Sequence, residues 1–306
     1  MIQISSLLTQ SWFQREHYKG FGNFLQTPHG SLHFVDLPGN TYSEPKSNLT
    51  EQQGGVPTIF IHGNLGWSYE WRHILASASS RVIAPDLLGF GLSHRGNHPL
   101  SLDLHAELLG SLIVFLKLKK FNIVAHDLGS QLGLMLIQKF PDFVHKVIFI
   151  NAWYDQSKIE AQSKRFAVKS TLNWLSLKAY LYFGFTINLV NMNLWKYVLD
   201  LPEKDKQSFF QMQPFGYRRQ SISFRRQMSV SNHLSLENQE SIISLRLPTL
   251  ILWGKKDSLI DRHHLAYWQN MIPDAPTVIF SKSGHWPHLD NVETTSEVIH
   301  QFIADY

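Results

Sequence analysis

The sequence predicts an α/β protein whose sheet is mostly parallel and whose core is interrupted by a helical block. One observation is that short apolar strand patterns alternate with helical patterns, which is typical of a parallel sheet. Another is that the strand pattern stops between Trp153 and Leu236, where only helical apolar-aromatic periodicity is found. We therefore expect a core formed by residues 1–152 and 237–306, and a helical cap formed by residues 153–236.

The predicted elements follow in chain order. An opening hairpin is expected at residues 22–27 and 31–37, followed by a polar surface loop at 40–55. Buried strands are expected at residues 57–61, 81–84, 122–125, 144–151, 248–253 and 276–280. Helices are expected at residues 101–119 and 292–304, and also immediately after residue 127.

Composition limits the classes of function. The 306 residues, 43% hydrophobic and 17% charged, suit one large globular unit, or one domain with an inserted subdomain. Cysteine is absent, which excludes disulfides and thiolate metal sites. The net charge of +4 comes without a basic stripe for nucleic acid, and neither a metal-ligand spacing nor a phosphate-binding glycine pattern is present. We expect no nucleic-acid partner, no metal and no cofactor.

The apolar segments do not predict a membrane protein. The first residues lack the basic, apolar and small-residue regions of a signal peptide. The longest uncharged helical stretch, Ala179 to Trp195, is broken by polar residues and is too short to span a bilayer. The sequence therefore predicts a cytoplasmic protein with no integral membrane segment.

The segment NIVAHDLGSQLG, residues 122–133, has the layout of a nucleophile elbow, a sharp turn from a strand into a helix. Small residues, Ala125 and Gly129, flank its centre because the turn is too tight for larger ones. Asp127 takes the central place, where serine is usual. We predict that Asp127 is a nucleophile and that His126 orients the elbow.

An aspartate at this place favours chemistry at a saturated carbon. A serine attacking such a carbon would form an ether, which a catalytic triad cannot hydrolyse. A carboxylate instead forms an ester. A histidine can then activate water to attack the ester carbonyl, which releases an alcohol and regenerates Asp127.

Five segments of the predicted core share a pattern with one group of enzymes. They read HGNLGWSYEWRHI, VIAPDLLGFGLS, HDLGSQLG, LWGKKDSLI and SGHWPH in chain order. Together they resemble the haloalkane dehalogenase and epoxide hydrolase branch of the α/β hydrolases. The resemblance covers most of the core and is weak in the cap. It implies an α/β-hydrolase fold, while Asp86, in the second segment, is expected to be a turn residue.

The resemblance also implies the other members of a catalytic triad. His285, after a strand and a glycine, is the predicted base, whereas His288 is expected on the surface. Asp257, in the loop after the strand at 248–253, is the predicted acid that orients His285. Some dehalogenases place the acid after the preceding strand, but Asn151 stands there in this chain. Asp261 is expected to cap the following helix.

The resemblance further implies donors for the charge that develops during the reaction. Asn64 and the backbone N–H of Leu128 are the expected oxyanion donors. In dehalogenases the asparagine side chain and a tryptophan indole also hold the departing halide, and that tryptophan usually follows the nucleophile. Leu128 departs from this pattern. Trp174 in the cap is the first candidate for a replacement, and Trp153 is the second.

Three functions remain open at this point. We expect a haloalkane dehalogenase-like hydrolase that converts a small apolar alkyl halide into an alcohol and halide. An epoxide hydrolase would instead use cap tyrosines, with Tyr180, Tyr182 and Tyr217 as candidates, but its His-Gly pair is usually followed by an aromatic residue. A catalytically silent binding protein with this fold is the third possibility. The sequence leaves the oligomeric state open.

Overall fold

The structure is a computed structural model, and it describes most of the predicted core. It covers residues 10–11, 13–14, 18–19, 22–39, 55–64, 66–95, 100–153, 201, 203–212, 246–257 and 260–304. Within these ranges no helix is both long enough and apolar enough to cross a bilayer. Most of the segment 153–236 lies outside the described residues, so its extent as a cap stays a prediction.

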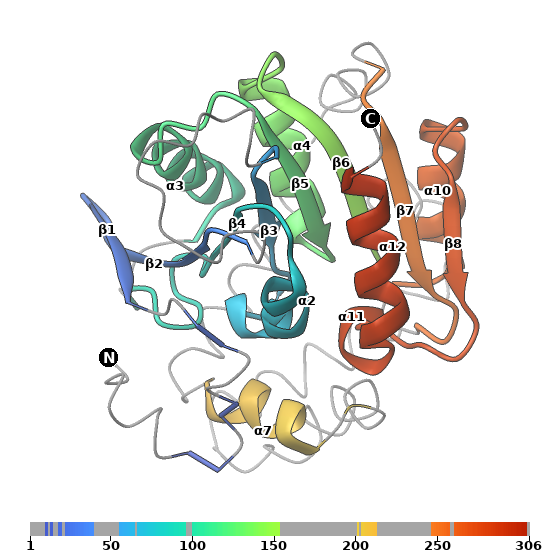
Figure 1. The fold of residues 1–306 in the computed structure, drawn as a ribbon, viewed down its shortest axis with the longest axis horizontal. Helices are drawn as coiled ribbons and strands as arrows, with labels where there is room; N and C mark the ends of the chain where they lie inside the picture. Colours follow the sequence, from blue (N-terminus) through green and yellow to red (C-terminus); the bar gives the residue numbers. More distant parts are fainter. Residues whose placement is uncertain are drawn as a thin grey trace, which may run out of the picture.

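An eight-stranded sheet forms the centre of the described chain (Figure 1). Its order is β1-β2-β4-β3-β5-β6-β7-β8; β1 and β2 form an antiparallel hairpin, β2 is antiparallel to β4, and all later pairs are parallel. The strands are β1 (Asn23–Thr27), β2 (Gly30–Leu37), β3 (Thr58–Ile61), β4 (Val82–Pro85), β5 (Phe121–His126), β6 (Val144–Ile150), β7 (Thr249–Gly254) and β8 (Thr277–Phe280). The predicted α/β class and parallel sheet are confirmed, and the predicted strand ends are right to within one residue.

Helices pack on both faces of this sheet. The described helices are η1 (Ser68–Trp71), α2 (Arg72–Ser77), α3 (Leu102–Phe115), α4 (Gly129–Lys139), α7 (Glu203–Gln211), α10 (Arg262–Met271), α11 (Pro287–Asp290) and α12 (Val292–Ala304). Helices α3, α4 and α10 lie in one layer, and α2 and α12 lie in the other. The prediction for α12 is confirmed residue for residue, and Asp261 caps α10 by accepting the His263 N–H at 2.9 Å. Helix α3 ends earlier than expected because Lys117 has a φ of 55°, which a helix cannot continue through.

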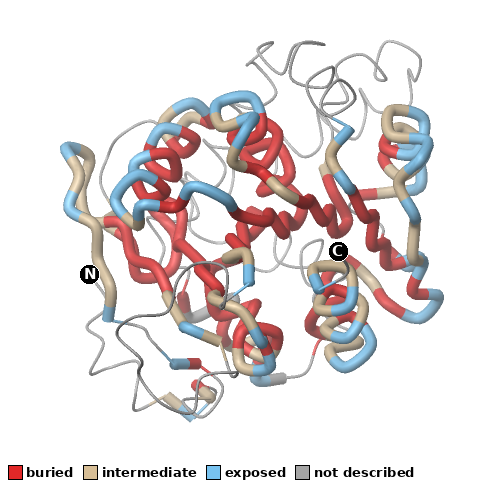
Figure 2. Tube along the Cα trace, turned by 45° about the horizontal axis from the view of Figure 1, so that its top comes forward, coloured by how far each residue is buried: buried red, intermediate tan, exposed pale blue. Residues whose placement is uncertain are grey.

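Alternation along the strands divides the core into two layers. Ile123 and Ala125 of β5 pack with apolar side chains of α3, α4 and α10, whereas Val124 packs with those of α2 and α12. The central strands are buried on both faces (Figure 2), as parallel strands usually are. Because β3, β5, β6 and β7 are parallel, their carboxyl ends lie at one edge of the sheet, where the loops that follow them lie together.

Helix α7 is the one described helix inside the predicted cap, and it contacts the core through polar groups. Its Asp205 carboxylate accepts a hydrogen bond from the Arg72 guanidinium at 2.6 Å. Its Ser208 hydroxyl accepts the Trp67 indole N–H at 3.0 Å. A segment late in the chain thus lies beside the loop that follows β3.

Candidate active site

Asp127 stands at the turn between β5 and α4 in a strained backbone conformation. Its φ is 49°, in the left-handed region that non-glycine residues rarely adopt. The turn also lies very close to the backbone at the end of the neighbouring strand, β3. A Cβ on Gly129 would lie 2.5 Å from the Ile61 carbonyl oxygen and 2.8 Å from that of His62. The small residue that the sequence analysis noted at this place is therefore required by close packing.

Gly129→Ala should lower the free energy of unfolding by about 1–3 kcal/mol, because backbone atoms must move to admit the methyl group. Gly133→Ala, one turn later in α4, is the matched control. Its added Cβ would meet its nearest neighbour at 3.4 Å, an ordinary contact. That variant should be as stable as the wild type or more stable by up to about 1 kcal/mol. Urea unfolding of both variants measures the difference, and equal values would contradict the packing argument.

The loop after β3 presents a backbone donor to the Asp127 carboxylate. The Asn64 N–H donates to Asp127 Oδ2 at 2.9 Å. The loop is fixed by His62, whose Nε2 accepts the Leu87 N–H at 2.9 Å and whose Nδ1–H therefore donates to the Gly63 carbonyl at 2.8 Å. The predicted donor residue Asn64 thus reaches Asp127 through its main chain. Leu128, the other predicted donor, is buried directly before the first residue of α4.

His285 and Asp257 are hydrogen-bonded, as the sequence analysis expected of a base and its acid. His285 Nδ1 lies 2.8 Å from Asp257 Oδ2, and both side chains are almost fully buried. Asp257 Oδ1 accepts the Ile260 N–H at 2.9 Å. Burial raises the pKa of Asp257, but His285 and these hydrogen bonds lower it by more, so the carboxylate is ionised at neutral pH.

Asn151 supports the acid from the end of the neighbouring strand. Its Nδ2 donates to Asp257 Oδ2 at 2.7 Å, and its Oδ1 accepts the Gly254 N–H at 2.8 Å. Its φ of 40° turns the chain after β6. The sequence analysis treated Asn151 only as a missing carboxylate. Asn151 follows the strand after which some dehalogenases place the acid, and this position could have indicated that its side chain lies beside Asp257.

His126 links the elbow to the loop of the predicted base. Its Nε2 lies 2.8 Å from the His285 carbonyl oxygen. A carbonyl only accepts hydrogen bonds, so Nε2 carries a hydrogen and donates it. The residue before the predicted nucleophile therefore contacts the backbone of the predicted base, although the two are far apart in the sequence.

Behind His126 lies a buried pair of residues that the sequence analysis missed or misplaced. Glu70 was not singled out, and the prediction that His288 lies on the surface is wrong. His288 is fully buried, with its ring stacked on Trp71 at a centroid distance of 4.4 Å. Glu70 Oε1 lies 3.3 Å from His126 Nδ1 and 3.5 Å from His288 Nε2. The stacking explains the error, because Trp71 covers a ring whose sequence position resembles an exposed one.

Asp86 has the structural role expected of it. Its Oδ1 accepts the Ser68 N–H at 2.7 Å, and its Oδ2 accepts the Leu92 N–H at 2.7 Å. His33 Nδ1 lies 2.8 Å from the same Oδ2. These contacts fix the turn after β4 and the start of η1.

The model of the alpha/beta hydrolase fold family matches residues 56–292, which is more than half of the chain. The chain belongs to the α/β-hydrolase family. The match includes the elbow and the loops that bear His285 and Asp257, which agrees with the resemblance in the sequence.

This α/β hydrolase is similar to proteins of several activities. The cis-3-alkyl-4-alkyloxetan-2-one decarboxylase of Shewanella oneidensis is 22% identical over 275 residues, 83% of this chain and 82% of that protein. A mutant of the haloalkane dehalogenase DatA from Agrobacterium tumefaciens has a TM-score of 0.73 at 19% identity, covering 96% of this chain and all of that one. The epoxide hydrolase of Bacillus megaterium has a TM-score of 0.70 at 18% identity, covering 92% and 100%. These structural similarities establish the fold of the hydrolase.

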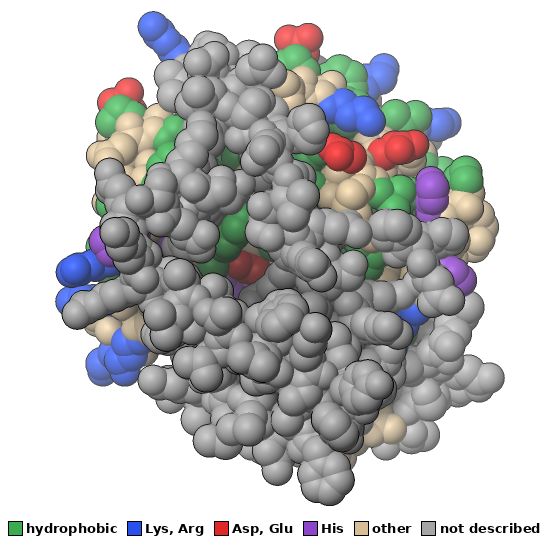
Figure 3. Space-filling view, turned by 180° about the vertical axis from the view of Figure 1, so that it is seen from behind, with side chains coloured by type: hydrophobic (Ala, Val, Ile, Leu, Met, Phe, Trp, Pro, Cys, Tyr) green, Lys and Arg blue, Asp and Glu red, His purple; other side chains and the backbone are tan. Residues whose placement is uncertain are grey.

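The cap donors predicted from the sequence lie outside the described residues of this hydrolase; they are Trp174, Tyr180, Tyr182 and Tyr217. Trp153 is described and is half-buried, and its backbone N–H donates to the Asp127 carbonyl oxygen at 3.1 Å. Seen from behind, hydrophobic, acidic and histidine side chains of described residues are visible near the centre of the view (Figure 3).

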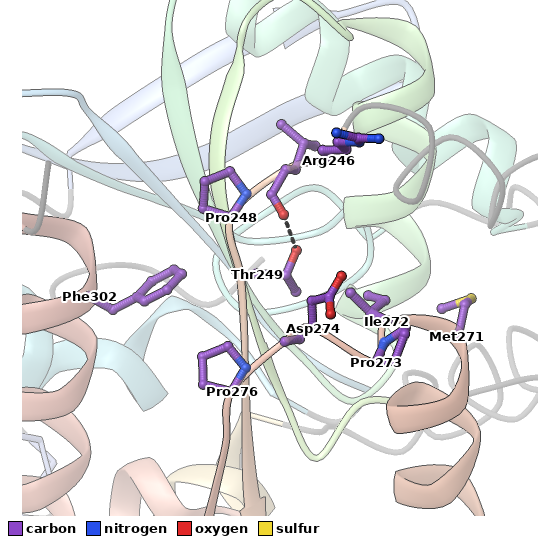
Figure 4. Close-up of a pocket in the computed structure, with 11 residues that line it drawn as sticks. Arg246, Pro248, Thr249, Met271, Ile272, Pro273, Asp274, Pro276 and Phe302 are labelled. Atoms are coloured by element: carbon purple, nitrogen blue, oxygen red, sulfur yellow. Dashed lines mark hydrogen bonds between the residues drawn. The ribbon is translucent and has the colours of Figure 1, made fainter.

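A separate pocket lies at the opposite edge of the sheet. Figure 4 shows Pro248, Pro276 and Phe302 on one side of it and Asp274 and Ile272 on the other. It is formed where β7 and β8 begin, whereas Asp257 follows the end of β7. In α/β sheets, ligands bind at the carboxyl ends of the strands, so this pocket is not the candidate active site.

Proposed function

We propose that this hydrolase acts through an aspartyl-ester intermediate and is haloalkane dehalogenase-like, converting small apolar alkyl halides into alcohols and halide. The observation that supports this most is the carboxylate of Asp127 at the elbow, held by the Asn64 N–H at 2.9 Å. His285, which is hydrogen-bonded to Asp257, is the base that ester hydrolysis needs. A serine hydrolase would need a hydroxyl at position 127.

In the first step, one carboxylate oxygen of Asp127 attacks the saturated carbon, and the carbon–halogen bond breaks with its electron pair leaving on the halide. The Asn64 N–H holds Oδ2, so Oδ1 is the attacking oxygen and Oδ2 becomes the ester carbonyl oxygen. The product of this step is an alkyl ester of Asp127 and a halide ion.

In the second step, His285 removes a proton from water while the water oxygen attacks the ester carbonyl carbon. The negative charge develops on Oδ2, next to the Asn64 N–H that already contacts it. The alcohol oxygen then leaves with the proton from His285. The new carboxyl group of Asp127 releases its remaining proton to solvent, which regenerates the carboxylate. Asp257 stabilises the imidazolium that forms between these events.

Leu128 limits the first step because a halide leaving in a dry site needs donors. Each such donor contributes about 3 kcal/mol by analogy with an oxyanion hole, or roughly 10²-fold in rate. Leucine offers no side-chain donor at the position where dehalogenases commonly have tryptophan. We therefore expect weak turnover of bromo- and iodoalkanes, with chloroalkanes poorer because chloride is the worse leaving group.

Leu128→Trp should raise halide release from 1-bromobutane by up to roughly 10²-fold, since the indole N–H restores the missing donor. Leu128→Phe is the matched control, because it adds an aromatic ring without a donor. Ion chromatography of released bromide measures both variants, with thermal unfolding to verify that they fold. An equal rise in both variants would mean that ring size, and not the donor, controls the rate.

Epoxide hydrolysis is the alternative, supported by the similarity to the Bacillus megaterium enzyme and by Leu128. Diol formation from styrene oxide should then exceed halide release and disappear when Tyr180, Tyr182 or Tyr217 becomes Phe. An alkyl oxetan-2-one belongs in the same assay because of the named activity of the Shewanella relative. If no substrate turns over and Asp127 takes up no label from ¹⁸O water, the silent binding protein is favoured.

A further inference from the structure

Three metal-ligating side chains meet behind the candidate active site. Glu70 comes from η1, His126 from the end of β5 and His288 from α11. Their nearest ligating atoms all lie within 4.8 Å of one another, and all three residues are at most 2% exposed. We call these residues the buried His-Glu-His cluster.

The hydrogen bond made by His126 leaves a ring lone pair facing the Glu70 carboxylate. His126 Nε2 donates to the His285 carbonyl oxygen, so the neutral ring has a lone pair on Nδ1. That nitrogen makes no hydrogen bond with the described residues, and neither do the two carboxylate oxygens of Glu70 nor the ring nitrogens of His288. Buried polar atoms without partners are costly, so a positive species is needed between them.

The chemistry of the cluster suits a metal ion. It brings together one carboxylate, from Glu70, and two imidazoles, from His126 and His288. Carboxylate oxygen and imidazole nitrogen are ligands that zinc commonly takes in proteins.

The distances within the cluster distinguish an ion from a direct hydrogen bond. Charge-assisted hydrogen bonds are about 2.7–2.9 Å long. In a tetrahedral zinc site with bonds of about 2.0–2.1 Å, the ligand atoms are separated by about 3.4 Å. Glu70 Oε1 lies 3.3 Å from His126 Nδ1 and 3.5 Å from His288 Nε2, which matches the tetrahedral separation.

We propose that Glu70, His126 and His288 bind a divalent transition-metal ion of the zinc class. The ion joins the segment after β3, the end of β5 and the segment that follows His285. Its role is structural: it fixes His126, which in turn donates to the His285 carbonyl oxygen. The ion takes no part in bond breaking, and the proposal does not depend on which substrate the hydrolase uses.

The test is the metal content of the full chain, produced in zinc-supplemented medium and purified without chelators. Mass spectrometry of the elements should find about one zinc per chain, and protein prepared in cobalt should show the visible absorption of four-coordinate Co²⁺. Glu70→Gln and His288→Phe should each reduce the metal to about a tenth or less. His105→Phe, a change at an equally buried histidine outside the cluster, is the matched control and should keep the metal.

The wild type decides the matter even if the variants fail to fold. Wild-type protein with less than about a tenth of an equivalent of any transition metal would overturn the proposal. The proposal would also be overturned if refolding with zinc gave the same melting temperature as refolding without it. A proton shared between Glu70 and the two histidines would then take the place of the ion. Undiminished metal in both cluster variants would place the ion elsewhere. Because metal content is read without a substrate, these outcomes are distinct from a failure of the proposed activity.

Discussion

His285→Gln should convert the hydrolase into a protein that alkylates itself once and then stops. The first step needs only the Asp127 carboxylate, whereas the second needs a base to activate water. Turnover should fall by at least roughly 10³-fold, while the ester on Asp127 accumulates. Intact-protein mass spectrometry after incubation with a 1-bromoalkane or 1-iodoalkane measures the adduct, and peptide mapping should locate it at Asp127.

The matched control is Asp127→Asn, which keeps the shape of the side chain but replaces the attacking carboxylate with a poor nucleophile. It should form no adduct, alone or together with His285→Gln. An adduct that forms equally with Asn at position 127 would show that another group is alkylated. Turnover that continues in His285→Gln at more than a tenth of the wild-type rate would remove His285 from the role of base.

Arg72→Met should lower the free energy of unfolding by about 3–5 kcal/mol, because it leaves a buried carboxylate without its partner. The Arg72 guanidinium donates to Asp205 Oδ1 at 2.6 Å, and the two side chains are 2% and 5% exposed. Burial raises the pKa of Asp205 even though Arg72 opposes it, which indicates how poorly this site accepts an unpaired charge. Urea unfolding measures the change.

Two further variants separate the ion pair from a general effect of losing an arginine. Arg81→Met breaks the partly exposed pair with Asp36, in which the Arg81 and Asp36 side chains are 34% and 22% exposed, and should cost less than about 1 kcal/mol. Replacing Asp205 with Leu together with Arg72→Met should recover much of the lost stability, because no buried charge remains. Similar losses for Arg72→Met and Arg81→Met would contradict the argument.

The Arg72–Asp205 contact also matters for the predicted cap. Asp205 belongs to α7, within the segment 153–236, whereas Arg72 follows the loop that bears Asn64. Neither residue was expected to contact the other, because a charged pair far apart in the chain has no local pattern. The sequence predicted a cap from its missing strand pattern, and the tertiary structure supplied the point where α7 meets the core.

The sequence alone determined the class of fold and the strand ends, and it predicted the candidate triad. The fold and the elbow depend on neighbours along the chain, such as the alternation in β5 and the small Gly129 after Asp127. The short range of such patterns makes them readable in a sequence. Asp257 and His285 were predicted from the resemblance of their loops to one group of enzymes, and the structure brings these two side chains into contact.

Only the tertiary structure decided which distant side chains share a buried space. Glu70, His126 and His288 have no ligand spacing in the sequence, and they meet because the ends of parallel strands and the loops beside them converge at one edge of the sheet. Asn151 reaches Asp257 for the same reason, since β6 and β7 are neighbours. Burial of His288 depends on a ring from another element, Trp71, so no pattern around His288 itself could predict it.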